Sequence, residues 1–407
     1  MIVSSLYRTF ERIGRSTALT LCVRFVDGTQ YQNVSGESDV LLTYRTRRAE
    51  MKTLLYGHVG LLESYFEQEL DVVGDLDKAF AIGFGSRFAE HGSPLVWLRN
   101  QWHELRFSNR SRAQAKRNAR AHYGLGAAFY RYWLDAPLMM YTCAYWPDGT
   151  ETLEQAQSNK LDHICRKIRL ESGERVVDIG CGFGGFMFHA AERYGADVCG
   201  LNTTTEQVEF VRQEIDRRQL GQRLTVREAD FRDVQDTFDK VVSIGVLEHA
   251  GRDQLAEVVR AHAAFVRPGG LGVLHFIGHV GQRDTEFYIR RYVFPGGWIP
   301  SLSATLAAME GAGLEILDVE NLRRHYALTL EVWAERFEQR WNDIQALDPV
   351  TFDERFRRIW RAYLVSCAEM FRAEHGSTHL FQITFANGNV SRQSYPMSRD
   401  HLYRDGR

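Results

Sequence analysis

A glycine-rich turn after an apolar stretch constrains the fold of this chain more than any other feature. The segment 175–185 reads Arg-Val-Val-Asp-Ile-Gly-Cys-Gly-Phe-Gly-Gly, and a helical stretch follows at 186–194. A strand therefore delivers a carboxylate, Asp178, and then a G-x-G-x-G loop whose backbone N–H groups and helix N-terminus can face a nucleotide-type ligand. Such loops also serve NAD, FAD and purely structural bends, so the neighbouring strands must decide.

The next strand argues against a dinucleotide. A dinucleotide site needs an acidic residue at the end of that strand to bind the ribose hydroxyls. Here the strand at 197–201 runs into Asn202 and three threonines, with no acid at its tip. Strand-like stretches at 238–244 and 271–276 follow. This order resembles the class I S-adenosylmethionine methyltransferases, and it predicts an α/β fold with a Rossmann-like domain.

Five sequence blocks narrow the resemblance. They occur in the order of the cyclopropane-fatty-acid synthases and together resemble that family, with a strong match from about His122 to Phe371. The resemblance implies methyl transfer from S-adenosylmethionine to the cis double bond of an unsaturated acyl chain in a membrane phospholipid. The blocks are Met140-Tyr-Thr-Cys-Ala-Tyr-Trp146, Ile179-Gly-Cys-Gly-Phe-Gly-Gly185, Val246-Leu-Glu-His-Ala-Gly251, Leu274-His-Phe-Ile-Gly278 and Tyr292-Val-Phe-Pro-Gly-Gly297.

The resemblance also implies how the cofactor is held. The loop glycines would admit its methionine portion, and Asp178 would support the loop or the ammonium group. The sequence leaves open two structural roles, Asp178 as a strand-end cap and Thr203 as the N-cap of a helix at 204–215. The implied residues are Tyr141 and Thr142 beside the cofactor, Asp178, Gly180, Gly182 and Gly184 in the loop, Thr203 and Gln207 at the ribose and adenine, and Asp230 and Phe231 at the adenine amino group and ring face.

A second set of residues would serve the chemistry. An isolated alkene is a poor nucleophile, so the reaction needs alignment, exclusion of water and a base for a proton of the added methyl group. In the synthase family this base is held to be a bound bicarbonate, to which His and Tyr can donate hydrogen bonds and from which Glu can accept one. Each side chain alone has an ordinary structural use. The matching residues are Cys143, Glu248, His275 and Tyr326, with the backbone at Ile277.

The segment before the first block departs from the family. Residues 122–130 read His-Tyr-Gly-Leu-Gly-Ala-Ala-Phe-Tyr, so polar side chains of the family are missing at Gly124, Ala127 and Ala128. The sequence therefore leaves open whether proton loss closes a cyclopropane ring or gives a methyl-branched or methylene fatty acid. Two further hypotheses are a methyltransferase for a soluble small molecule and a lipid-binding protein with a decayed catalytic core. The intact glycine loop argues against decay.

The length of 407 residues predicts two domains. Alternation at 19–26, a turn at Asp27-Gly28, a strand at 40–44 and a helix at 47–57 predict a small α+β unit. This unit resembles a sterol-carrier-like domain, although a generic docking domain would show the same pattern. The predicted parts are an α+β lipid-binding-like domain at 1–95, a basic linker or helical segment at 96–121, the catalytic domain with C-terminal helices at 122–390 and a loosely ordered polar tail at 391–407.

The strongest charge block lies at 106–120, where basic residues occur without an acid. Each basic side chain near an anionic membrane contributes about 1 kcal/mol of attraction. Arg112, Lys116, Arg117 and Arg120 are therefore candidates for docking on phospholipid headgroups, although a solvated helix face would carry the same charges. Nucleic acid is disfavoured as a partner because aromatic residues are not interleaved with the charges.

Composition bounds the remaining possibilities. A formal net charge of −2 gives no global attraction to nucleic acid or lipid. The six cysteines form no C-x-x-C pair, which favours reduced thiols in the cytoplasm and disfavours a metal site. No apolar stretch reaches the length that spans a membrane. We therefore expect a cytoplasmic enzyme that visits the inner leaflet peripherally, and the resemblance implies a homo-oligomer.

Overall fold

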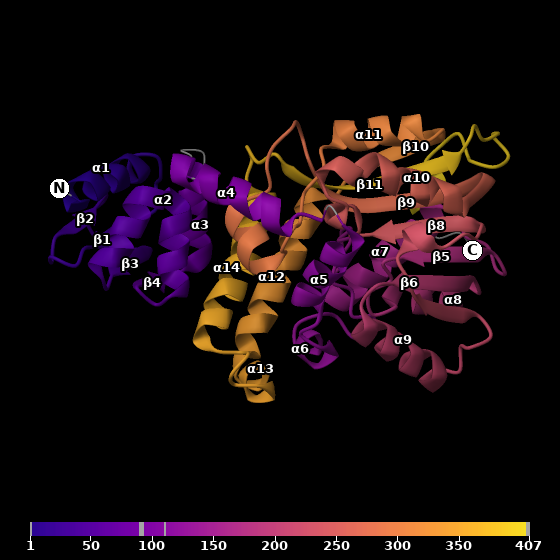
Figure 1. The fold of residues 1–407 in the computed structure, drawn as a ribbon, viewed down its shortest axis with the longest axis horizontal. Coiled ribbons are helices and arrows are strands. Elements are labelled where there is room, and N and C mark those ends of the chain that lie inside the picture. The colour runs from indigo at the N-terminus through magenta and orange to yellow at the C-terminus, as the bar shows by residue number, and fades with distance from the viewer. Residues whose placement is uncertain (1, 89–92, 110, 404–407) are drawn as a thin grey trace. The chain divides into compact units, whose positions relative to one another are not determined.

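The computed structural model describes residues 2–88, 93–109 and 111–403, with the backbone alone for 112, 113 and 119–121. The chain forms two compact units, each assembled from three stretches of sequence (Figure 1). The N-terminal unit contains Met1–Arg106, Glu286–Val293 and Trp333–Gly376. The Rossmann-like unit contains Phe107–Thr285, Phe294–Val332 and Ser377–Arg407.

The N-terminal unit contains a four-stranded sheet with the order β2-β1-β3-β4. The first two strands form the predicted antiparallel hairpin, while β3 lies parallel to β1 and antiparallel to β4. The helix predicted at 47–57 continues to Phe66 beyond a break at Gly57, whose φ of 57° suits glycine. The elements are α1 (Ile2–Gly14), β1 (Leu21–Arg24), β2 (Gln30–Gln32), β3 (Val40–Tyr44), α2 (Arg47–Phe66), β4 (Leu70–Gly74), α3 (Leu76–Gly85) and α4 (Pro94–Phe107).

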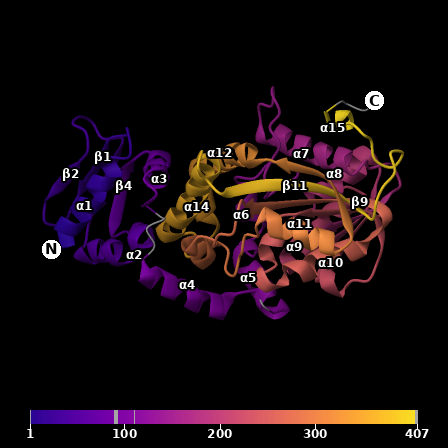
Figure 2. The ribbon, with the colours of Figure 1, turned by 90° about the horizontal axis from the view of Figure 1, so that it is seen from above.

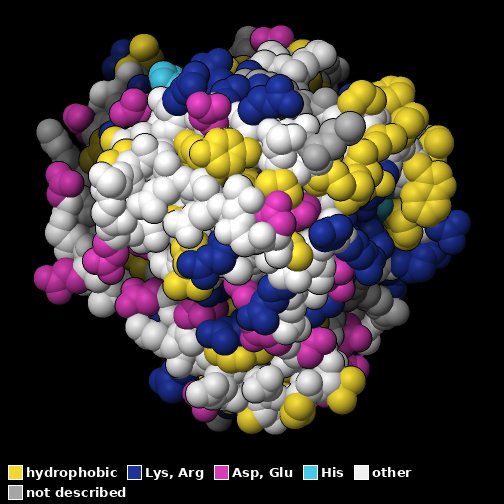
Figure 3. All heavy atoms as spheres, turned by 90° about the vertical axis from the view of Figure 1, so that its left-hand side faces the viewer, with side chains coloured by type: hydrophobic (Ala, Val, Ile, Leu, Met, Phe, Trp, Pro, Cys, Tyr) yellow, Lys and Arg dark blue, Asp and Glu magenta, His cyan; other side chains and the backbone are white. Residues whose placement is uncertain are grey.

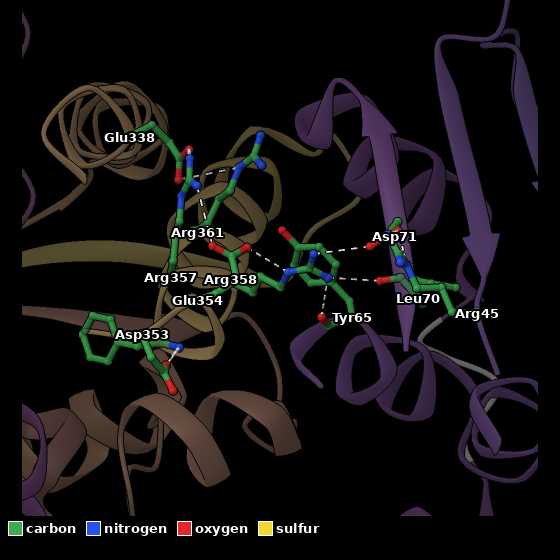
Figure 4. A network of polar contacts seen from close by, with 11 residues as sticks. Arg45, Tyr65, Leu70, Asp71, Glu338, Asp353, Glu354, Arg357, Arg358 and Arg361 are labelled. Carbon is green, nitrogen blue, oxygen red and sulfur yellow. Dashed lines mark hydrogen bonds and ion pairs between the residues drawn. The ribbon is translucent and has the colours of Figure 1, made fainter. Parts of the chain in front are cut away.

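Late segments of the chain complete this unit. The helix α14 packs against α2 and α3, and Arg358 on α14 donates to the carbonyls of Tyr65 and Leu70 at 3.0 and 3.2 Å (Figure 4). The C-terminal helices from residue 333 therefore group with the N-terminal unit, whereas the sequence placed them in the catalytic domain. The bounds are Ile289–Val293 for a π-helix, α12 (Arg323–Gln339), α13 (Trp341–Leu347) and α14 (Glu354–Arg372).

A seven-stranded sheet with the order β10-β11-β9-β8-β5-β6-β7 forms the Rossmann-like unit. The strands from β9 to β7 are parallel, and β11 pairs antiparallel with both β9 and β10. The predicted α/β class is confirmed. The strands are β5 (Arg175–Ile179), β6 (Asp197–Asn202), β7 (Leu224–Glu228), β8 (Phe238–Ile244), β9 (Val266–His279), β10 (Leu314–Asn321) and β11 (Thr378–Asn387).

Helices cover both faces of this sheet, which is why its parallel strands are continuously apolar. Successive residues of β5 belong to different cores: Val176 packs with residues of α7, α8 and α9, and Val177 with residues of α10. Figure 2 shows α7 and α8 on one side and α10 and α11 on the other. The helices are α5 (Arg112–Tyr123), α6 (Ala127–Arg131), α7 (Leu153–Lys167), α8 (Gly185–Tyr194), α9 (Thr205–Arg217), α10 (Leu255–Phe265), α11 (Leu302–Gly311) and α15 (Asp400–Tyr403), with 3-10 turns at Phe231–Asp233, Leu247–His249 and Arg252–Gln254.

The described part of the C-terminal tail makes specific polar contacts, and the loose order expected for 391–407 stays a prediction. Arg169 donates to the carbonyls of Gln393 and Ser394 at 3.0 and 2.8 Å. Arg399 pairs with Asp318 at 2.6 Å. Polar side chains thus bind the tail to the rest of the Rossmann-like unit. The polar composition of the tail does not by itself indicate these contacts. Among the residues described, no helix is long and apolar enough to cross a membrane.

Candidate active site

The glycine loop joins β5 to α8 with three glycines in left-handed backbone conformation. The φ angles are 73° at Gly180, 54° at Gly182 and 82° at Gly184, which other residues rarely adopt. A Cβ on Gly180 would lie 2.5 Å from the Val246 side chain, whereas one on Gly182 would meet no described atom within 4 Å. The N-cap of α8 is Gly184, which has no side chain to cap the first turn. Open backbone and an uncapped helix N-terminus fit the carboxylate end of S-adenosylmethionine.

Asp178 lies directly before this loop and is buried. Burial raises the pKa of its carboxyl to about 7, and the charge of Lys160 opposes that rise. The supporting role of Asp178 at the loop stays a prediction.

Lys160 on α7 contacts a predicted cofactor residue, although the sequence did not mark it as a site residue. Its side chain is fully buried, and its Nζ donates to Thr142 Oγ1 at 3.0 Å. Burial lowers the pKa of Lys160 to about 8, while Asp135, Cys143 and Asp178 favour its charged form. One buried cation therefore connects Thr142 with the acid of the cofactor loop. The signal was present in the sequence as a lysine on the face of α7 that also carries Leu161 and Ile164.

Tyr141 lies in an aromatic group next to Thr142. Its hydroxyl is 3.2 Å from His122 Nε2, and the two rings stack with centroids 5.5 Å apart. The rings of Tyr130 and Trp133 lie 5.4 and 5.1 Å from that of Tyr141. The segment 122–130, which departs from the family, thus packs on a predicted cofactor residue.

The tip of β6 holds its amide and hydroxyl groups in a fixed arrangement. Asn202 Nδ2 donates to Gln207 Oε1 at 3.0 Å and to the Gly182 carbonyl at 3.2 Å. Asn202 therefore connects the predicted Gln207 to the glycine loop. The N-cap of α9 is Thr204, so the hypothesis that made Thr203 the helix cap was wrong by one residue.

Asp230 and Phe231 follow β7 at the same edge of the sheet. The carboxylate of Asp230 accepts from the backbone N–H of Arg232 at 3.0 Å and from its Nη2 at 2.6 Å. The ring of Phe231 packs edge-on against His262 at 5.0 Å. Arg232 holds the Asp230 carboxylate in place, and the adenine contacts of both residues stay a prediction.

Glu248 follows strand β8, and His275 lies on the neighbouring parallel strand β9. Glu248 Oε1 accepts from the backbone N–H of Ile277 at 2.7 Å, so that N–H holds the carboxylate. His275 Nδ1 accepts from Gln382 Nε2 at 3.0 Å, which places the ring proton of the neutral imidazole on Nε2. Among the described residues, Glu248 Oε2 and His275 Nε2 are buried without a hydrogen-bond partner. Gln382, the residue opposite His275 on β11, was not anticipated from the sequence.

Burial sets the charge states of this pair. It raises the pKa of Glu248 to about 7, although the hydrogen bond from Ile277 opposes the rise. Burial, with the nearby Lys160 and Lys167 charges, holds the pKa of His275 well below its usual range. His275 is therefore a neutral donor at Nε2. The Glu248 carboxylate can exchange a proton near neutral pH.

Cys143 and Tyr326 both contact the backbone of Leu322, which follows β10 and pairs with β11. Cys143 Sγ is 3.9 Å from the Leu322 carbonyl, to which the backbone N–H of Tyr326 donates at 3.1 Å. The Leu322 N–H donates to Leu380, which pairs with Ile277 across β11 and β9. Burial raises the pKa of the Cys143 thiol, so it stays protonated. Contacts through Leu322 and Leu380 thus link Cys143 and Tyr326 to the strand that carries His275 and Ile277, and the joint role of the four predicted side chains stays a prediction. An added Cβ on Gly180 would meet the side chain of Val246, two residues before Glu248.

The donor set fits a small oxyanion as well as a sulfonium cofactor. A neutral imidazole N–H and a carboxylate oxygen offer one donor and one acceptor, which is what a bicarbonate can use. Among the described residues, His, Cys, Asp and Glu form no cluster of three or more that could hold a metal ion.

The sheet order and the glycine loop between β5 and α8 define a class I S-adenosylmethionine-dependent methyltransferase. Residues 110–383 match the family model described as "Mycolic acid cyclopropane synthetase". The chain belongs to this family, and it is an enzyme of the cyclopropane synthase type of S-adenosylmethionine-dependent methyltransferase.

Three relatives illustrate the similarity. The chain is 38% identical over 353 residues to a "Probable fatty acid methyltransferase" of Pseudomonas putida, covering 84% of this chain and 86% of the relative. It is 33% identical over 343 residues to the "Cyclopropane-fatty-acyl-phospholipid synthase" of Escherichia coli (strain K12), covering 83% and 85%. The solved structure of mycolic acid cyclopropane synthase CmaA1 with SAH and CTAB is 29% identical, with a TM-score of 0.62 and coverage of 67% of this chain and 98% of that chain.

Proposed function

We propose that this enzyme methylates the cis double bond of an unsaturated acyl chain in a membrane phospholipid and closes a cyclopropane ring with the help of a bound bicarbonate. The bicarbonate would be held by Cys143, Glu248, His275 and Tyr326. The printed names of the relatives, which include a cyclopropane-fatty-acyl-phospholipid synthase and a fatty acid methyltransferase, support the acyl substrate. The enzyme would act at the cytoplasmic leaflet.

One observation carries the proposal for the base. Leaving a buried polar atom without a partner costs about 1–3 kcal/mol, and proteins retain such atoms where a ligand satisfies them. Here Glu248 Oε2, an acceptor, and His275 Nε2, a donor, are both buried and without a partner among the described residues. A bicarbonate would satisfy both, because it carries a hydroxyl and unprotonated oxygens.

Different residues of the chain would bind the cofactor, accept the proton and exclude water. S-adenosylmethionine supplies an electrophilic methyl group, which the π electrons of the alkene can attack as the sulfonium–carbon bond breaks. The glycine loop and Asp178 would hold this cofactor. Glu248, held by the Ile277 N–H, would accept a proton near neutral pH, and His275 would orient the anion through its Nε2–H. Burial around Cys143 would exclude water from the cationic acyl chain.

Methylation without ring closure is the second candidate. The Pseudomonas putida relative is named a probable fatty acid methyltransferase, and the chain lacks polar side chains at Gly124, Ala127 and Ala128 next to the aromatic group. Both outcomes share the transfer of the methyl group and differ in the proton that leaves. A methyl-branched or methylene acyl chain would then be the product.

The direct test is to incubate the protein with S-adenosylmethionine and vesicles of unsaturated phospholipid. Mass spectrometry measures the added carbon, and NMR of the extracted lipid separates cyclopropane protons from branched or vinylidene ones. We expect ring protons that depend on added bicarbonate. A branched product would select the second candidate, and unmodified lipid with turnover of a soluble acceptor would contradict both.

A further inference from the structure

The helix α4 exposes large apolar side chains on its outward face. Soluble proteins normally turn such residues inward, and a contiguous exposed patch marks an interaction site. On this helix, the exposed fraction is 59% for Trp97, 56% for Leu98, 63% for Trp102 and 72% for Leu105.

The inward face of α4 is polar. Arg99 forms an ion pair with Glu63 at 2.5 Å, and Glu104 pairs with the buried Arg290. His103 is buried, and its Nε2 lies 3.1 Å from the carbonyl oxygen of Arg290. Polar contacts therefore fasten α4 to the N-terminal unit, while its apolar residues point away. This arrangement reverses the usual one and leaves the apolar face of α4 open to an interaction outside the unit.

The apolar surface extends beyond α4. Ser93, just before the helix, donates to the Leu55 carbonyl of α2 at 2.5 Å. Leu54 and Leu55 are themselves exposed, at 39% and 41%. Figure 3 views the N-terminal unit and shows a dense group of hydrophobic side chains at one side of the face, with Lys and Arg next to it.

Positive charge accompanies this surface. The sequence from Arg106 to Arg120 carries six basic residues and no acid, and it begins at the end of α4. The Arg106 guanidinium lies 6.0 Å from the Trp102 ring. Tryptophan with arginine is the composition that binds the headgroup level of a bilayer, and an apolar anchor with a basic segment gives stable attachment where either alone is weak.

We propose that the outward face of α4, with Trp97, Leu98, Trp102 and Leu105, inserts into the headgroup region of an anionic phospholipid bilayer. The inference rests on the proposed function, because it assumes a substrate held in a bilayer. Docking by the basic residues of α5 stays a separate prediction. Lys116, one of the predicted docking residues, already pairs with Glu228 at 3.0 Å. The side chains of Arg112 and Arg120 lie outside the described residues.

The test compares the triple variant Leu98→Gln/Trp102→Gln/Leu105→Gln with the unmodified protein in vesicle sedimentation. A matched control, Val350→Gln/Met397→Gln, changes apolar residues that are 87% and 89% exposed elsewhere. On vesicles of phosphatidylglycerol and phosphatidylcholine we expect the triple variant to bind more than about tenfold more weakly, because buried apolar area is lost. The control binds normally. Equal binding of the triple variant and the unmodified protein overturns the proposal.

Two further measurements keep the test decisive. If the triple variant does not fold, quenching by spin-labelled lipid is compared between the unmodified protein and Trp97→Phe/Trp102→Phe. Less quenching in the variant supports insertion of α4, and equal quenching overturns it. Sedimentation velocity without lipid detects a second copy as the occupant: dissociation of the triple variant with unchanged vesicle binding also overturns the proposal.

Activity separates this proposal from the proposed function. With an unsaturated phospholipid dispersed in detergent, the triple variant should methylate at the normal rate and lose activity only on vesicles. If the unmodified protein binds vesicles through α4 but methylates no lipid in either form, the proposed function fails while the docking surface stands.

Discussion

At the scale of single residues, the pairing of Glu248 with the Ile277 N–H carries most of the proposed chemistry. We expect Glu248→Gln and His275→Ala each to lower kcat for acyl methylation by about 10²-fold or more, because each removes a group that acts on the proton or on its acceptor. Affinity for S-adenosylmethionine, measured by calorimetry, should stay within about twofold in both variants. Near-normal turnover in both would remove these residues from the reaction.

The raised pKa of Glu248, about 7, adds a pH dependence with a definite sign. An acid whose pKa is higher in the folded protein destabilises the fold as pH rises from the unfolded value toward the folded one, since the folded state holds the proton more tightly. Relative to the unmodified protein, Glu248→Gln should therefore gain melting temperature between pH 5 and pH 8. Asp178, whose pKa is also raised, titrates in both proteins and cancels in the comparison. A constant difference in melting temperature across this range would show that the pKa of Glu248 is not raised in the folded protein.

Lys160 permits a third residue-scale prediction. Lys160→Met removes the hydrogen bond to Thr142 and the cation that favours the charged form of Asp178. We expect about tenfold weaker binding of S-adenosylmethionine and a lower melting temperature, because a buried carboxylate loses its compensating charge. The matched control is Lys240→Met, a buried lysine that pairs with Glu174 at 3.3 Å. It should lose stability and keep its affinity. Equal affinity losses would mean that Lys160 acts through stability alone.

At the scale of elements, the predicted cofactor site depends on the glycine loop that joins β5 to α8. Gly180→Ala would meet Val246 at 2.5 Å in a conformation with φ of 73°. Because the loop must shift, we expect more than about tenfold loss of S-adenosylmethionine affinity. Gly221→Ala is the control, since no described atom lies within 4 Å of its added Cβ. Calorimetry on both variants measures the difference, and equal affinities would show that the loop tolerates the shift.

The parallel part of the sheet was predictable from the sequence, and its antiparallel edge was not. The strands β5, β6 and β8 read as apolar runs bounded by turns, and a cofactor motif fixed their class. The strands β10 and β11 pair with each other although they lie far apart in the sequence, beginning at Leu314 and Thr378. The local sequence pattern of a strand does not reveal such a distant partner. The same limit applies to the site. Glu248 and His275 lie in motifs, whereas Lys160 and Gln382 gain their roles only when distant elements pack.

At the scale of the whole molecule, the N-terminal unit depends on residues that follow most of the Rossmann-like unit in the chain. Arg358 binds the carbonyls of Tyr65 and Leu70 and pairs with Asp71 at 3.3 Å (Figure 4). Its side chain is mostly buried, so its loss removes hydrogen bonds from a charged donor, which contribute about 1.5–3 kcal/mol each.

We therefore expect Arg358→Ala to lower the stability of the N-terminal unit and to speed amide hydrogen exchange in β4 and at the end of α2. Arg340→Ala is the control, because Arg340 is exposed and contacts Asp343 at 3.4 Å, a pair that contributes little. Exchange in β5 and β8 should not change, since the hydrogen-bond partners that the structure describes for Arg358 lie outside these strands. If β4 exchanges at the same rate in both variants, the contacts of Arg358 do not stabilise β4, and the domain predicted from the sequence at 1–95 does not depend on this arginine of α14.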